Sequence, residues 1–162
     1  MSVRRAVPGD EVVLRQVRLG AVADAPSAFA TDLERERART PEDWRRWLSP
    51  GATLLWQEGG SPAQGLVAGV IDGGGSAHLA ALWVHPDRRG RGVGDALVAG
   101  LVGWAHGERR RLSLQVVASN EHARHLYDRH GFVVVGDPAI GTSGALEVAM
   151  EHRGTVPLPR GR

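Results

Sequence analysis

Two residue types are missing from this 162-residue chain: it has no cysteine and no lysine, so its twenty basic residues are all arginines. Without cysteine there is no disulfide framework and no thiol nucleophile, which excludes a mechanism through an acyl-cysteine. No stretch of about 18 apolar residues is present, so we predict no membrane span. The first residues lack the apolar segment of a signal peptide. We therefore expect a cytoplasmic protein.

Strong charge of either sign is also lacking. The chain has 20 basic and 18 acidic residues and a formal net charge of +2, which is weak support for a nucleic-acid partner. Its length and its 42% of hydrophobic residues are typical of one globular domain with a full core. We predict a single domain over residues 1–154, followed by a proline- and arginine-rich tail, 155–162, that is frayed.

Hydrophobic periodicity and turn residues predict an α/β domain. Alternating or continuous apolar stretches indicate strands, and apolar residues three and four apart indicate helices. Stretches rich in Gly and Pro separate these elements. The charged segment 29–39 is predicted to be a loop or an irregular helix. The predicted strands are 2–6, 53–57, 64–71, 78–84, 112–117, 132–135 and 145–150, and the predicted helices are 8–23, 41–48, 92–106 and 121–130.

The most informative segment runs from Leu82 to Val98, where an apolar strand leads through an arginine- and glycine-rich turn into a helix. The first N–H groups of a helix have no intrahelical partners, and glycine lets a phosphate approach them closely. A P-loop needs a Gly-Lys pair, which a chain without lysine cannot supply. The dinucleotide motif Gly-x-Gly-x-x-Gly fails because Gly90, Gly92 and Gly94 are evenly spaced. The segment therefore predicts a phosphate cradle of another kind.

The sequence Arg89-x-x-Gly92-x-Gly94 resembles motif A of the GNAT superfamily of N-acetyltransferases, whose loop binds the pyrophosphate of acetyl-CoA. Downstream, Asn120-x-x-Ala-x-x-Leu-Tyr-x-x-x-Gly-Phe132 is similar to motif B of the same superfamily. The order and separation of the two blocks also match. On these residues the chain is identified as a member of the superfamily.

This resemblance implies the GNAT fold, a mixed and mostly antiparallel sheet of about seven strands flanked by about four helices, with the fourth and fifth strands splayed. It implies acetyl-CoA as co-substrate and no metal. Trp83 and Val84 would pair with the pantetheine arm, and a backbone N–H near Val84 would stabilise the oxyanion. Asn120 would contact the arm or cap a helix. The implied cofactor-binding residues are Leu82, Trp83, Val84, Arg89, Gly90, Arg91, Gly92, Val93, Gly94, Asp95, Asn120 and Tyr127.

Catalysis calls for an acid and a base. The resemblance places Tyr127, the one tyrosine of the chain, as the acid that protonates or stabilises the departing thiolate; packing is the alternative. Many relatives carry a carboxylate base on the fourth strand, whereas this strand offers only His78. Histidine titrates near neutral pH and is the candidate base, with a surface bystander as the alternative. A chain of waters remains an equal alternative. Glu34 and Glu36 are rival bases and candidates for substrate binding, because the resemblance places their segment beside the acceptor pocket, although we favour a solvated helix face.

The leading hypothesis is an acyltransferase that moves the acetyl group of acetyl-CoA directly to a primary amine, on a small molecule or a protein, without an acyl-enzyme. The alternative is a non-catalytic sensor or subunit that binds CoA or acyl-CoA. Nucleic-acid binding is not expected, because the arginine-glycine run is short and lacks interleaved aromatics. His122 and His125 have no further ligands to complete a metal site. Homodimers are frequent in the family and are compatible with this sequence.

The phosphate cradle yields a direct prediction. Gly94→Glu or Gly92→Glu should abolish binding of acetyl-CoA, because each change puts a carboxylate where the phosphates would lie. Isothermal titration with acetyl-CoA measures the loss, and circular dichroism checks that the fold survives. Normal binding by either variant would mean that the phosphates bind elsewhere.

Overall fold

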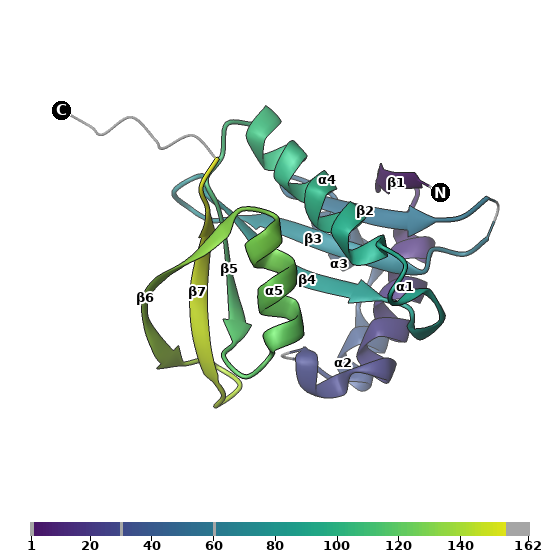
Figure 1. The fold of residues 1–162 in the computed structure, drawn as a ribbon. Helices are drawn as coiled ribbons and strands as arrows, with labels where there is room; N and C mark the ends of the chain where they lie inside the picture. Colours follow the sequence, from purple (N-terminus) through teal and green to yellow (C-terminus); the bar gives the residue numbers. More distant parts are fainter. Residues whose placement is uncertain (1, 30, 60, 155–162) are drawn as a thin grey trace.

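The computed structural model describes residues 2–29, 31–59 and 61–154. Within these residues, helices pack against both faces of one sheet (Figure 1). The predicted tail, 155–162, lies outside the described residues. The strands are β1 (Ser2–Arg5), β2 (Ala52–Gln57), β3 (Gly65–Ile71), β4 (Ala77–Val84), β5 (Leu112–Val117), β6 (Phe132–Ile140) and β7 (Leu146–His152). The α-helices are α1 (Glu11–Asp24), α2 (Leu33–Ala38), α3 (Pro41–Arg46), α4 (Val93–Gly107) and α5 (Glu121–Arg129).

All seven strands belong to one sheet, in the order β1-β2-β3-β4-β5-β7-β6. Every neighbouring pair is antiparallel except β4 and β5, which are parallel and are joined through α4. A parallel pair needs such a crossover because the chain must return to the same end of the sheet. The predicted mixed, mostly antiparallel sheet is confirmed.

Helices cover the two faces of the sheet unequally. The helices α4 and α5 lie on the face shown in front in Figure 1, whereas α1 and α3 pack on the opposite face of β2 and β3. Side chains alternate along a strand, so Leu54 joins the core under α4 and Leu55 joins the core under α1. Of the helices that the structure describes, none lies behind β5, β7 and β6 in Figure 1. The described residues therefore leave one face of this half of the sheet uncovered.

The parallel strands β4 and β5 pair only at their beginnings. The paired residues are Ala77 with Leu112 and His78 with Ser113, and no further pair follows in the described part of the chain. Two residues on, β4 carries a bulge at Ala80, because its neighbours Leu79 and Ala81 pair with the consecutive residues Gly69 and Ala68. A bulge bends its strand and increases the local twist. The two strands then diverge (Figure 1), which confirms the predicted splay.

The described residues contain one more α-helix than the sequence predicted. The additional helix, α2, lies in the charged segment 29–39, and its six residues are too few to display an apolar period. Asp32 caps it by accepting a hydrogen bond from the Arg35 N–H at 2.9 Å. The following helix begins as predicted, with a capping box between Thr40 and Asp43. No helix in the described ranges is long and apolar enough to cross a membrane.

An ion pair in the interior fastens α2 to α1. Glu36 is completely buried, and one of its carboxylate oxygens accepts a hydrogen bond from Arg18 Nε at 3.3 Å. The other oxygen accepts from Arg39 Nε at 3.2 Å. The guanidinium of Arg18 lies over the rings of Phe29 and Trp47. The favoured interpretation of position 36 as a solvated helix face is therefore wrong, because pairing with Arg18 draws this carboxylate inside.

This buried pair predicts a large difference between two neighbouring glutamates. Glu36→Gln should lower the free energy of unfolding by about 3 kcal/mol, because it leaves the buried charge of Arg18 without its counter-charge. Glu34→Gln, at an exposed position of the same helix, is the matched control and should change it by less than about 0.5 kcal/mol. Urea unfolding of both variants measures the difference. Equal losses would contradict the assignment of Glu36 as the buried partner.

Candidate active site

The glycine turn after β4 leaves the first N–H groups of α4 accessible. Gly92 is the N-cap residue of α4 with a φ of +79°, and no side chain caps the helix. Gly90 has a φ of +71°, and a Cβ added at either glycine would meet no atom within 4 Å. The uncapped N–H groups and the positive end of the helix dipole therefore face open space, which is the arrangement that binds phosphate.

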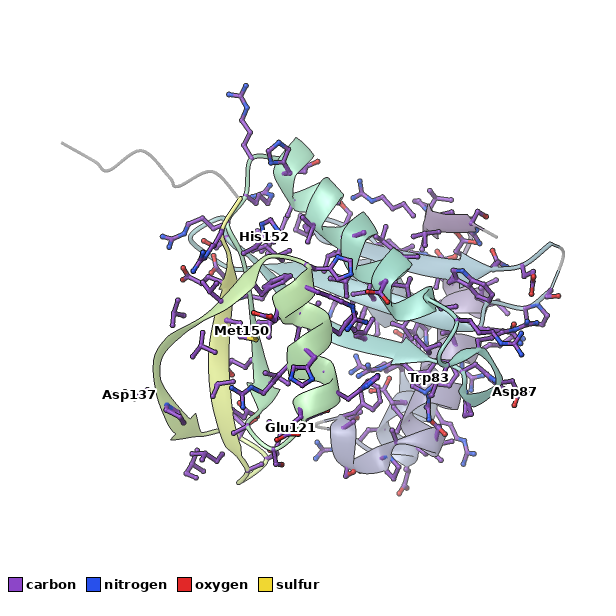
Figure 2. All side chains as sticks on the ribbon, viewed as in Figure 1. Trp83, Asp87, Glu121, Asp137, Met150 and His152 are labelled. Carbon is purple, nitrogen blue, oxygen red and sulfur yellow. The ribbon has the colours of Figure 1, made fainter. Side chains whose placement is uncertain are left out.

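A cleft of about 520 Å³ lies beside this turn, between the end of β4 and α5. Figure 2 shows Trp83 near the tip of β4, Asp87 in the loop that follows, and Glu121 at the start of α5 across the gap. Of the residues predicted to bind the cofactor, the cleft brings together Leu82, Trp83, Val84, Arg89, Gly90, Gly92, Val93, Gly94, Asp95 and Asn120. Arg91 and Tyr127 are not among its lining residues.

Six further residues line the cleft and were not assigned from the motifs: Ala25, Arg88, His122, Ala123, Leu126 and Arg129. Four of them, His122, Ala123, Leu126 and Arg129, follow Asn120 within motif B. The last three are spaced by three residues on α5, so the helical period contained a signal for them. Ala25 comes from the end of α1, far away in the sequence. No local pattern could have placed it beside β4.

The motif arginine, Arg89, is held by partners within the protein. Its Nε donates a hydrogen bond to the carbonyl oxygen of Val84 at 3.0 Å, and its Nη2 pairs with the Asp24 carboxylate. The same carboxylate accepts a hydrogen bond from the Trp83 indole N–H at 2.9 Å. The hydrogen bond from Trp83, and then that from Arg89, holds the pKa of Asp24 below its usual value. Asp24, which the sequence analysis did not single out, thus joins the end of α1 to β4 through Trp83 and to the turn before α4 through Arg89.

Asp95 lies in the first turn of α4, where its carboxylate would repel a diphosphate if it were free. It accepts two hydrogen bonds from Arg129, at 2.7 and 3.0 Å, and one from His130 at 2.8 Å. The pKa of Asp95 is lowered to about 2, chiefly by the hydrogen bond from Arg129. Desolvation opposes this shift, and the hydrogen bond from His130 adds to it. The side chain therefore fastens α5 to the start of α4, and its negative charge is compensated.

Asn120 and Tyr127 are positioned by α5. The side chain of Asn120 accepts a hydrogen bond from the Ala123 N–H at 3.2 Å, so it caps the helix while also lining the cleft. Tyr127 is only 6% exposed and packs edge-to-face on Phe132, with 5.8 Å between ring centroids. This burial raises the pKa of Tyr127 to about 12. Its hydroxyl therefore stays protonated at neutral pH and can act as a hydrogen-bond donor.

His78 lies where β4 and β5 begin to separate. Its Nε2 is 2.7 Å from the Asp72 carboxylate and its Nδ1 is 2.6 Å from the hydroxyl of Ser113. Two cavities, of about 360 and 490 Å³, share His78 and Ser113 in their linings. The predicted base is thus part of a hydrogen-bonded group, and two of its members, Asp72 and Ser113, were missed because neither belongs to a motif.

The two glutamates predicted to bind substrate differ in their surroundings. Glu34 is exposed on α2. Glu36 is completely buried and paired with Arg18 and Arg39, so its carboxylate is not presented to a ligand. Neither residue lines the cleft beside α4.

The chain belongs to the acetyltransferase (GNAT) family, whose model matches residues 21–132. It is 37% identical over 132 residues to the mycothiol acetyltransferase of Acidimicrobium ferrooxidans. That match covers 78% of this chain but only 42% of the relative, so this chain spans less than half of the relative's length.

Solved structures of acetyltransferases share the fold. The chain superposes on yncA from Salmonella typhimurium, solved with its cofactor acetyl-CoA, with a TM-score of 0.74 and 17% identity, over 100% of this chain and 99% of that one. A GNAT acetyltransferase from Streptococcus pneumoniae gives a TM-score of 0.72 and 24% identity, over 93% and 96% of the two chains. At these identities the likeness establishes the fold.

The contacts of Asp95 predict a pH-dependent contribution to stability. Its pKa in the folded protein lies below the ordinary value of 3.8, so the carboxylate stabilises the fold above about pH 4 and loses this effect as the pH falls through about 2. Asp95→Asn should therefore lower the Tm at neutral pH, and its difference from the wild type should shrink in acid. Asp128→Asn, on the exposed side of α5, is the control. A difference independent of pH would contradict the ion pairing.

Proposed function

We propose that this chain is an N-acetyltransferase that moves the acetyl group of acetyl-CoA to a primary amine by direct attack in a ternary complex. The observation that carries the proposal is the uncapped start of α4, with open space over Gly90 and Gly92, beside the gap between β4 and β5. The uncapped helix start suits phosphates. The gap suits an extended arm that contains amides, because among the described residues the facing edges of β4 and β5 have no partner beyond His78 and Ser113.

The residues present fit a bound CoA thioester in a defined way. The first N–H groups of α4 would hold the pyrophosphate, with Arg91 adding positive charge nearby. The free edge of β4 around Trp83 and Val84 would hydrogen-bond to the pantetheine arm and offer an N–H to the oxyanion. The bound co-substrate supplies an activated acetyl group on a thiolate leaving group. A chain without cysteine has no thiol of its own to carry that group.

Tyr127 is the residue we propose to act on the leaving sulfur. With a pKa of about 12, the phenol is a weaker acid than a thiol of about 8.5, so complete proton transfer to a thiolate is uphill. Donation of a hydrogen bond from the hydroxyl to the developing thiolate is the role that this burial favours. The hydroxyl does not ionise at any pH used in ordinary assays.

The experiment that tests the function follows from the missing cysteine. Isothermal titration with acetyl-CoA, with free CoA and ATP as controls, measures donor binding. Released CoA is then measured with a thiol reagent, to which this protein contributes no signal. The amines to be screened are free amino acids, polyamines, an aminoglycoside and peptides with a free N-terminus or lysine. Binding without turnover of any amine would favour the sensor hypothesis, and absence of binding would refute both.

Tyr127→Phe keeps the buried ring and removes only the hydroxyl. We expect kcat to fall about 100-fold while the KM for acetyl-CoA stays within about threefold, because the hydroxyl acts on charge that develops in the transition state. Steady-state kinetics on the amine found in the screen measures both values. An equal loss of kcat and of acetyl-CoA binding would instead mean that Tyr127 only packs. The wild type should also show no loss of activity up to about pH 10 from ionisation of this hydroxyl.

A further inference from the structure

Three side chains from separate segments form one hydrogen-bonded series at the base of the gap between β4 and β5. Asp72 belongs to the turn between β3 and β4, His78 to β4 and Ser113 to β5. The distance from Asp72 Oδ2 to His78 Nε2 is 2.7 Å, and that from His78 Nδ1 to Ser113 Oγ is 2.6 Å. Both ring nitrogens of His78 are therefore engaged, and neither is free to contact a substrate directly.

The direction of these hydrogen bonds follows from the carboxylate. The other oxygen of Asp72 accepts from the N–H groups of Gly74 and Ser76, at 2.9 and 3.0 Å. The hydrogen bond from His78, and then those from the backbone, lower the pKa of Asp72, which keeps it ionised. An ionised carboxylate can only accept, so the neutral imidazole carries its proton on Nε2. Nδ1 then accepts a hydrogen bond from the Ser113 hydroxyl, whose own lone pairs remain available.

This series faces the uncovered side of the sheet. His78 is the register partner of Ser113, and Ser113 is the register partner of Glu151 on β7. The side chains of His78, Ser113 and Glu151 therefore lie on one face of the sheet. That face is opposite to the one carrying α4 and α5. A cavity of about 490 Å³ on it is lined by His78 and Ser113 and by Leu79 and Ala80, the β4 residues at the bulge. An acceptor entering there would approach β4 from the side opposite to the phosphate cradle.

The charged groups around the series come from neighbouring strands. Arg111, before β5, pairs with Glu151 on β7 at 3.2 Å. His152 and Arg153 line the adjoining cavity of about 360 Å³, together with Asp72 and His78. Asp72 is thus the carboxylate that contacts the imidazole, and Glu151 is already compensated by Arg111.

We propose that Ser113, His78 and Asp72 form a proton relay that deprotonates the acceptor amine, with Ser113 as the residue that touches the substrate. This inference rests on the proposed function. As the amine attacks, its N–H bond breaks and the proton bonds to Ser113 Oγ, while the hydroxyl proton of Ser113 moves to His78 Nδ1. The net change is the transfer of one proton from the amine to the imidazole, which Asp72 then stabilises as imidazolium. Solvent removes this proton after the product leaves.

The test compares Ser113→Ala and Ser113→Thr with a control serine. Ser113→Ala should lower kcat about 100-fold, and Ser113→Thr, which keeps a hydroxyl, should retain much of the activity. Acetyl-CoA binding by titration should be unchanged in both. Ser61→Ala, in the turn between β2 and β3, is the matched control and should have wild-type kinetics. Full activity of Ser113→Ala would overturn the relay.

The positioning role of Asp72 is read from a pH profile. In Asp72→Asn the acid limb of kcat/KM should move to lower pH and the plateau should fall, because the imidazolium loses the charge that stabilises it. A purely structural contact would lower the Tm and leave the position of the limb unchanged. Mass spectrometry of wild type quenched during turnover should find no acetyl group on Ser113. An acetylated Ser113 would overturn the relay in favour of covalent catalysis.

A measurement on the protein alone separates failure of the relay from failure of the proposed function. Long-range proton–nitrogen NMR of His78 should show the neutral tautomer protonated at Nε2. A proton on Nδ1 would overturn the relay even if acetyl transfer occurs. If the wild type binds acetyl-CoA but acetylates no amine, the proposed function fails and the relay fails with it. If the wild type acetylates an amine and Ser113→Ala is fully active, the relay is refuted and the proposed function stands.

Discussion

Two residue pairs join β4 to β5, and the bulge at Ala80 then turns β4 away from its neighbour. A sheet normally satisfies its backbone groups by continuous pairing, so strands that separate must leave N–H and C=O groups for another partner. Here the unpaired edges lie beside an uncapped helix N-terminus. The same local irregularity therefore leaves a slot between two unpaired strand edges, with an uncapped helix N-terminus beside it.

Three ion pairs join the helices, and the turn before α4, to one another. Asp95 joins α4 to α5, Asp24 joins α1 to the cradle through Arg89, and Glu36 joins α2 to α1 through Arg18. Because the chain uses arginine for all of its basic residues, each of these pairs employs a planar guanidinium with several donors. Charges that would otherwise repel an anionic ligand or destabilise the interior are compensated in this way.

The two faces of the sheet divide the work of the proposed reaction. The cleft beside α4 carries the features that suit the donor, whereas the opposite face, where β4 meets β5, carries the series from Asp72 through His78 to Ser113. Figure 2 shows Met150 and Asp137 on these last strands, well away from Trp83 at the cradle. The gap between β4 and β5 is where two substrates, each held on its own face, would meet.

Apolar periodicity predicted where the strands and the longer helices lie along the chain, because it records which face of each element is buried. The glycine turn before α4 was predicted as well, since Gly90, Gly92 and the helix that follows are consecutive in the chain. The remaining features depend on contacts made only in the folded protein. Asp24 contacts Trp83, which lies 59 residues away, Ser113 contacts His78, which lies 35 residues away, and α2 depends on a buried partner in α1. Long-range contacts of single polar residues leave no period in the sequence, so only the folded chain reveals them.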